Sequence, residues 1–96
     1  MSNYVISVRF PSTYQPSADS AEPWKLWFGE LGSALVERGN PIFARQTLGD
    51  CGPDSLLGGY TLISADNLDA AVAAARSCPI LGAGGGVEVG EITEVM

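Results

Sequence analysis

Residues 4–10 alternate between large apolar side chains and smaller or polar ones. One side of this stretch holds Tyr4, Ile6, Val8 and Phe10, and the other holds Val5, Ser7 and Arg9. A period of two is typical of a β-strand with one buried face. We therefore predict a first strand over residues 4–10, ended by Pro11, with a second face that is only partly apolar.

The next apolar pattern has the period of a helix and predicts one over residues 22–38. Its apolar members follow the i, i+3, i+4, i+7, i+11 spacing of a single helical face: Trp24, Trp27, Phe28, Leu31 and Leu35. Ser20 is the expected N-cap. Gly39 is the expected left-handed residue after the last turn, and Pro41 prevents continuation of the helix.

The second half of the chain repeats the strand and helix patterns. Shorter alternating runs predict strands over residues 42–48 and 59–64, joined as a hairpin through a turn rich in Gly, Pro and Asp. Alanine-rich residues 68–77 favour a helix, with Asp66 as the expected cap. A last strand is predicted over residues 87–95.

The predicted order β-α-β-β-α-β is that of the ferredoxin-like fold. This α+β arrangement has a four-stranded antiparallel sheet with both helices on one face, and we expect residues 1–96 to form a single domain of this kind. The opposite sheet face then exposes apolar positions such as Val5. A second copy of the chain, packed sheet to sheet, would cover them, so we expect a symmetric homodimer.

Composition and charge exclude several classes of function. The chain has 46% apolar residues, a net charge of −6 and no histidine, and the whole negative excess lies in residues 49–96. The absence of a basic stripe argues against nucleic acid or an anionic membrane surface as a partner. Without histidine, there is no imidazole for acid–base catalysis and no His-ligated metal, and the spacing of Cys51 and Cys78 does not support a metal site.

The N-terminus lacks the pattern of a secretory signal, and no apolar run is long enough to span a membrane. Two cysteines in that context are expected to stay reduced, so a cytoplasmic location is predicted. The glycine run at residues 82–86 leads into a predicted strand and is broken by Val87, which favours a flexible connection over a nucleotide-binding loop.

The candidates for binding are a small set of polar side chains and Cys51. They are Ser7, Arg9, Arg45, Asp50, Cys51 and Tyr60. Arg9 on the open sheet face is suited to clamp a carboxylate or phosphate, and the alternative is an interfacial ion pair or a rim charge. Trp24 and Trp27 are interpreted as core first, with stacking on a ligand as the alternative.

Three stretches resemble the YCII-related proteins, in particular the branch with an Asp-Gly-Pro-Phe signature. They are Trp24–Gly32 ahead of Gly39-Asn40, Cys51-Gly52-Pro53 followed by Leu57–Tyr60, and Asp66–Pro79 followed by Gly86–Val89. The resemblance implies a ferredoxin-like protomer in a dimeric α+β barrel with a small cavity. Relatives of that barrel include isomerases, a dehydrochlorinase and monooxygenases.

The signature itself departs from the family, because it reads Cys51-Gly52-Pro53-Asp54 here. The His-Asp dyad proposed for some members is absent. We therefore expect a small-molecule-binding or structural module without a cofactor, whose ligand is a small anion or an aromatic compound. The alternative is an isomerase- or lyase-type enzyme acting on a small ring or acidic metabolite, with Asp50 or Asp54 as acid or base.

Overall fold

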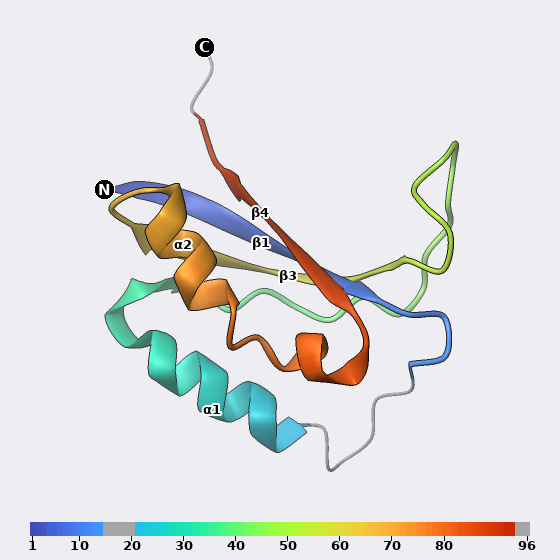
Figure 1. The fold of residues 1–96 in the computed structure, drawn as a ribbon, viewed down its shortest axis with the longest axis horizontal. Coiled ribbons are helices and arrows are strands. Elements are labelled where there is room, and N and C mark those ends of the chain that lie inside the picture. Colours follow the sequence, from blue (N-terminus) through green and yellow to red (C-terminus); the bar gives the residue numbers. More distant parts are fainter. Residues whose placement is uncertain (15–20, 94–96) are drawn as a thin grey trace.

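The computed structural model describes residues 1–14 and 21–93 and confirms the predicted order of strands and helices (Figure 1). The strands are β1 (Ser2–Phe10), β2 (Leu35–Glu37), β3 (Leu56–Ala65) and β4 (Gly86–Glu91). The α-helices are α1 (Ala21–Leu31) and α2 (Leu68–Ala75), and two 3₁₀ turns complete the set, η2 (Gly32–Ala34) and η3 (Pro79–Ala83).

The sheet has the strand order β2-β3-β1-β4, and every neighbouring pair is antiparallel. This is the ferredoxin-like topology that the sequence predicts. The register sets Ile6 of β1 opposite Thr61 of β3 and Val89 of β4. Because side chains alternate along a strand, Ser7, Tyr60 and Glu88 meet on the other face.

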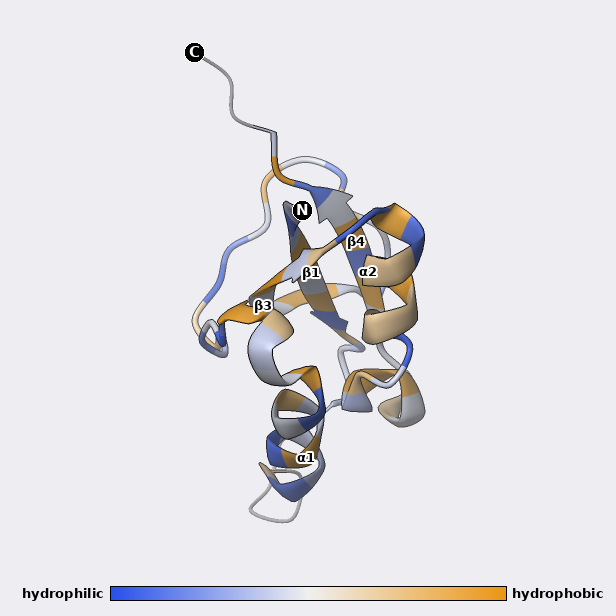
Figure 2. Cartoon of the chain, turned by 90° about the vertical axis from the view of Figure 1, so that its left-hand side faces the viewer, coloured by the Kyte–Doolittle hydropathy of each residue, from blue (hydrophilic) through white to orange (hydrophobic). Residues whose placement is uncertain are grey.

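Both helices pack on the same face of the sheet, where the core lies (Figures 1 and 2). The buried cluster joins Tyr4, Ile6, Val8 and Ile63 of the sheet to Trp27 and Leu31 of α1 and to Ala71 and Ala75 of α2. In Figure 2, α1 is banded in apolar and polar residues, whereas α2 is mostly pale orange because of its alanines. Small side chains let α2 lie close to its neighbours, and the Trp27 Nε1 donates to the Ala74 carbonyl at 3.1 Å.

The predicted helix over residues 22–38 is wrong beyond Leu31. Gly32 takes a left-handed φ of +53°, the helix ends there, and Leu35 becomes part of β2 opposite Ile63. Leu35 extends the apolar stripe of the helix by four positions, but the same side chain faces the same core from a strand. Glycine in the left-handed conformation ends the helix first. The Ser20 cap lies outside the described residues.

The predicted strand over residues 42–48 is also wrong. The chain there is irregular, and its backbone meets β3 through a bridge between Pro41 and Gly59 and a bond from the Ile42 amide to the Gly58 carbonyl at 3.1 Å. The true partner of β3 at this edge is β2. Alternation over residues 42–48 therefore reflects a loop that runs along the sheet without joining it.

The remaining boundaries shift by a few residues. The strand expected over 59–64 is confirmed as part of β3. Asn67, and not Asp66, caps α2, because its Oδ1 accepts from the Ala70 amide at 2.8 Å. β4 ends at Glu91, earlier than the predicted 87–95. No helix among the described residues is long and apolar enough to cross a membrane.

Candidate functional site

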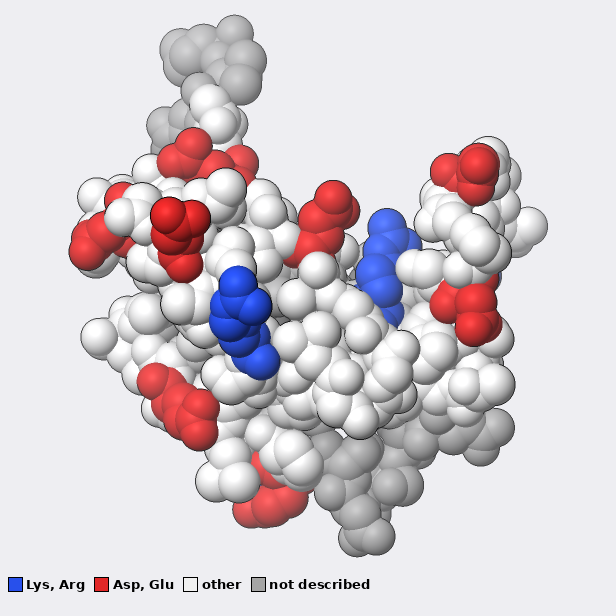
Figure 3. Space-filling view, in the orientation of Figure 1, with Lys and Arg blue, Asp and Glu red and all other residues white. Residues whose placement is uncertain are grey.

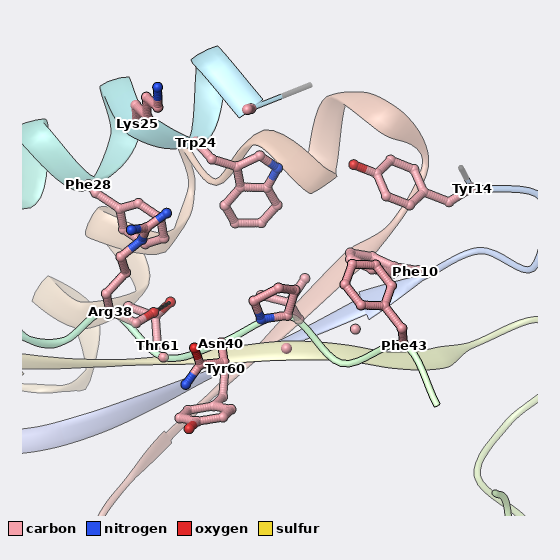
Figure 4. A pocket seen from close by; sticks show the side chains of 16 residues that line it. Phe10, Tyr14, Trp24, Lys25, Phe28, Arg38, Asn40, Phe43, Tyr60 and Thr61 are labelled. Atoms are coloured by element: carbon pink, nitrogen blue, oxygen red, sulfur yellow. Dashed lines mark hydrogen bonds between the residues drawn. The ribbon is translucent and has the colours of Figure 1, made fainter. Parts of the chain in front are cut away.

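A cavity of about 390 Å³ lies between the start of α1, the adjoining ends of β1 and β3, and the chain that follows β2 (Figure 4). We call it the aromatic pocket. Five aromatic side chains form its walls: Phe10, Tyr14, Trp24, Phe28 and Phe43. The polar side chains labelled around it in Figure 4 are those of Lys25, Arg38, Asn40 and Thr61.

The roof of the aromatic pocket exists because α1 is anchored at one end. Trp27 is only 2% exposed and Leu31 is buried against the sheet, so the C-terminal half of the helix is fixed. Trp24 and Phe28 lie on the same helical face but remain partly exposed. Their centroids are 6.1 Å apart, and together they face the cavity (Figure 4).

The floor of the pocket is made of backbone, because two glycines stand where β3 passes beneath it. A Cβ on Gly58 would lie 2.7 Å from the Phe10 ring, so only glycine lets that ring rest on the strand. Phe10 in turn lies 4.5 Å from Tyr14, centroid to centroid. The hydroxyl end of Tyr14 points across the pocket toward Trp24 (Figure 4).

The outer wall is the segment from Gly39 to Phe43. Gly39 has a φ of +76°, and a Cβ there would fall 1.8 Å from the Tyr60 carbonyl oxygen, so this turn requires glycine. The segment then follows β3 through the Pro41 bridge. Phe43 closes the wall at the side opposite Arg38 (Figure 4).

The charge around the pocket is positive although the chain is acidic. Arg38 and Lys25, two of the five basic residues, line it, and none of the described lining residues is Asp or Glu. The Arg38 guanidinium carbon lies 5.1 Å from the centroid of Phe28, a cation–π contact. Thr61 donates to the Arg38 carbonyl at 3.0 Å, which fixes the backbone that carries this cation. Lys25 points away from the cavity (Figure 4).

The residues proposed from the sequence do not gather in the aromatic pocket. Ser7 and Tyr60 lie opposite each other on the open sheet face. Only the backbone side of Tyr60 borders the pocket, because its ring points to the other side of β3 (Figure 4).

Arg9 and Asp54 border a separate, shallower hollow of about 250 Å³ at the end of β1, together with Ser55, Glu88 and the backbone of Gly84–Gly86. In the space-filling view, acidic side chains are spread over this face with few basic ones between them (Figure 3). A guanidinium bordered by two carboxylates is a poor receptor for an anion, because Asp54 and Glu88 repel the same charge that Arg9 attracts.

The other proposed residues lie on the long loop before β3, where Asp50 and Arg45 form hydrogen bonds that stabilise the loop. Asp50 accepts from the Gly52 amide at 3.1 Å, which closes a turn. Arg45 donates from Nε to the Leu57 carbonyl at 2.9 Å and from Nη2 to the Ile42 carbonyl at 2.6 Å.

Neither cysteine belongs to a disulfide. Cys51 is exposed on the loop, and its thiol lies 3.8 Å from the Leu48 carbonyl. Cys78 is buried, and burial raises the pKa of its thiol, which keeps it protonated and unreactive at neutral pH. Among the described residues, no three His, Cys, Asp or Glu side chains cluster as metal ligands.

Sequence reasoning missed most of the aromatic pocket. Trp24 is the exception, since stacking on a ligand is the alternative that its helical position left open. Tyr14, Arg38 and Phe43 come from separate irregular or short segments, and no periodic pattern links them.

Comparison with known proteins supports the fold. No protein-family model matches the sequence, and no curated protein matches it by sequence. Among solved structures, 5-chloro-2-hydroxyhydroquinone dehydrochlorinase (TftG) from Burkholderia phenoliruptrix AC1100, in complex with 2,5-dihydroxybenzoquinone, aligns with a TM-score of 0.62. The two chains share 16% identity over 97% of this chain and 95% of the other. At that identity, the likeness shows a common ferredoxin-like α+β fold.

Ser12 is bonded to Asp54, one of the carboxylates that border the hollow beside Arg9. Its hydroxyl and its amide (3.1 Å) both donate to Asp54 Oδ1, and these bonds lower the pKa of that carboxyl. Because the folded pKa is depressed, the bonds stabilise the fold above the ordinary Asp pKa of about 3.9, and the contribution is lost as the pH falls through the folded value.

We expect Ser12→Ala to raise the pKa of Asp54 toward that ordinary value, measured by NMR titration of the carboxyl carbon. Thr13→Ala, at the neighbouring exposed position, is the control and should leave it unchanged. An Asp54 pKa that is the same in Ser12→Ala and in the wild type would contradict this assignment.

Proposed function

We propose that this protein binds a small planar aromatic anion in the aromatic pocket and acts as a binding module without catalysis. The observation that carries the proposal is the convergence of aromatic side chains from four segments on one cavity, with Arg38 beside it. A volume of about 390 Å³ is within the range of small-molecule sites, roughly 300–1,000 Å³.

An aromatic ligand is favoured because flat faces surround the space. Trp24 and Phe28 offer theirs from the helix, and Phe10 and Phe43 lie across the cavity (Figure 4). Offset or edge-to-face packing of rings adds roughly 0.5–1.5 kcal/mol per pair beyond the burial of area. The partly exposed aromatic side chains of the pocket also become buried when the ring of a ligand enters.

An anionic substituent is favoured because the charged side chains described next to the cavity, Lys25 and Arg38, are both positive. The Arg38 guanidinium retains N–H donors that can form charge-assisted hydrogen bonds to a carboxylate or phenolate. Its stack on Phe28 holds the side chain near the rim without an acidic partner among the pocket residues.

The structural neighbour supports the chemical class. TftG was solved with 2,5-dihydroxybenzoquinone, a small flat oxygenated ring. Together with the order of the motifs along the sequence, this likeness supports the inference that the chain belongs to the YCII-related group of dimeric α+β barrels.

The alternative is an isomerase- or lyase-type enzyme on the same class of ligand, favoured by the dehydrochlorinase activity in the neighbour's name. Asp50 and Asp54 do not line the aromatic pocket, whereas the Tyr14 hydroxyl points into it. Conversion of a chlorinated hydroquinone with release of chloride, lost in Tyr14→Phe, would support this alternative over a binding module.

We further propose that the protein is a homodimer formed by the open sheet faces. Val5 and Leu62 lie opposite each other on that face, beside Ser7 and Tyr60, and all four side chains are partly exposed. A second copy would remove this apolar strip from water, and two-fold symmetry would pair it with itself.

Binding is tested with three one-ring probes. We expect benzoate to quench tryptophan fluorescence, while benzamide, which has the same shape without the charge, binds about tenfold more weakly, because one charge-assisted hydrogen bond is lost. Cyclohexanecarboxylate keeps the charge but loses ring stacking and should also bind more weakly.

Arg38→Gln should weaken benzoate to the level of benzamide, and Trp24→Ala should weaken all three probes. Arg76→Gln is the matched control, since Arg76 is an exposed arginine that does not line the pocket. Equal affinity for benzoate and benzamide would refute the anion specificity, and no binding of any probe would refute the site.

The dimer is tested by sedimentation equilibrium at micromolar concentration. We expect twice the 10.0 kDa chain mass for the wild type and the single chain mass for Leu62→Asp, because a charge would then be buried in the interface. Leu26→Asp, at a 64% exposed position on α1, is the control and should stay dimeric. A wild type with the mass of one chain rules out the proposed dimer.

A further inference from the structure

We infer that Arg45 is a positioning residue that fixes the outer wall of the aromatic pocket, and that it does so through Phe43. The inference rests on the proposed function for the ligand, but its structural half stands on the fold alone. Arg45 does not line the pocket. It acts on the segment that does.

The wall needs support because it has little of its own. Between β2, which ends at Glu37, and β3, which begins at Leu56, the chain forms no helix or strand. The contacts that tie the wall to β3 through its own backbone are the Pro41–Gly59 bridge and the bond from the Ile42 amide to the Gly58 carbonyl. Phe43 follows directly and is 63% exposed, so packing alone does not hold it.

Arg45 supplies the missing support on the far side of Phe43. Its guanidinium joins two carbonyls that belong to different segments, Ile42 of the wall and Leu57 of β3, at 2.6 and 2.9 Å. Phe43 is therefore held between the backbone bond at Ile42 and the side-chain bridge from Arg45. A charged donor strengthens both bonds compared with neutral ones.

Arginine suits this bridge better than lysine. Nε and Nη2 are parts of one rigid plane, so the two carbonyls are held at a fixed separation and orientation. A lysine ammonium is a single point at the end of a flexible chain and cannot reproduce that geometry. Removal of the bridge should let Phe43 leave the pocket without a change in the core, which lies on the other side of the cavity.

The consequence for the ligand depends on its length. A one-ring anion beside Arg38 and Trp24 need not reach Phe43, which lies at the opposite side of the pocket (Figure 4). A two-ring anion would extend to it. Arg45 therefore determines specificity for longer planar anions through the position of the Phe43 ring.

The experiment compares Arg45→Met and Arg45→Lys with the wild type, using benzoate and 2-naphthoate as probes. We expect both variants to weaken 2-naphthoate by up to about tenfold, the effect of losing one aromatic contact with Phe43, with benzoate little changed. In a Phe43→Ala background, Arg45→Met should cause no further loss, because the two residues act as one unit.

Amide hydrogen exchange of the ligand-free protein provides an independent readout. The Ile42 amide should exchange faster in Arg45→Met than in the wild type, while the Ala70 amide, bonded to Asn67 in the α2 cap, stays unchanged. Equal Ile42 exchange in the two proteins would overturn the positioning role whether or not any probe binds.

If the wild type binds 2-naphthoate and Arg45→Met binds it equally well, the positioning role is wrong and the proposed function stands. If neither probe binds the wild type, the proposed function is wrong, and the exchange of the Ile42 amide alone decides the role of Arg45.

Discussion

The burial of Trp27 is the contact on which the site depends. This side chain lies among the core residues of the sheet and donates to the Ala74 carbonyl of α2, so it fixes α1 to both the sheet and the second helix. The same side of α1 carries Trp24, one turn earlier, and Phe28, the next residue, and both line the cavity and remain partly exposed. An anchored half and an uncovered half of a single helix thus produce a core and a cavity from one apolar stripe.

The two faces of the sheet have different surroundings, and Gly39 and Tyr60 connect them. The backbone of Tyr60 borders the aromatic pocket, while its ring lies on the open face (Figure 4). Gly39 packs directly on that backbone and starts the outer wall. A second copy on the open face would therefore press on the strand that forms the floor of the pocket. In an acidic chain, the pocket keeps its basic character because its charged side chains, Lys25 of α1 and Arg38 just after β2, do not come from the acidic second half.

The fold could be predicted from the sequence where one pattern decides one element. Alternation over residues 4–10 and the alanine-rich run after Asn67 each point to a single structure, and the order of elements follows from them. Leu35 shows the limit, because its spacing fits a helix while its side chain meets the same core from β2. The pocket could not be predicted, since Tyr14, Arg38 and Phe43 come from separate segments, and periodicity does not encode the turn at Gly32 that ends α1 early. Arg45 was expected to bind a ligand, and its two bonds to carbonyls appear only in three dimensions.

The chain has two tryptophans, so the two indole N–H signals of a ¹H–¹⁵N spectrum report on the two halves of the helix separately. Trp24 borders the cavity, and Trp27 is buried with its N–H bonded to Ala74. Titration with 2-naphthoate, with the signals assigned by Trp24→Phe, is the most direct test of an open half beside an anchored one. We predict that the Trp24 indole signal moves in a saturable way while the Trp27 signal stays nearly fixed. A shift confined to Trp27, or saturation of binding with neither signal moving, would contradict the account.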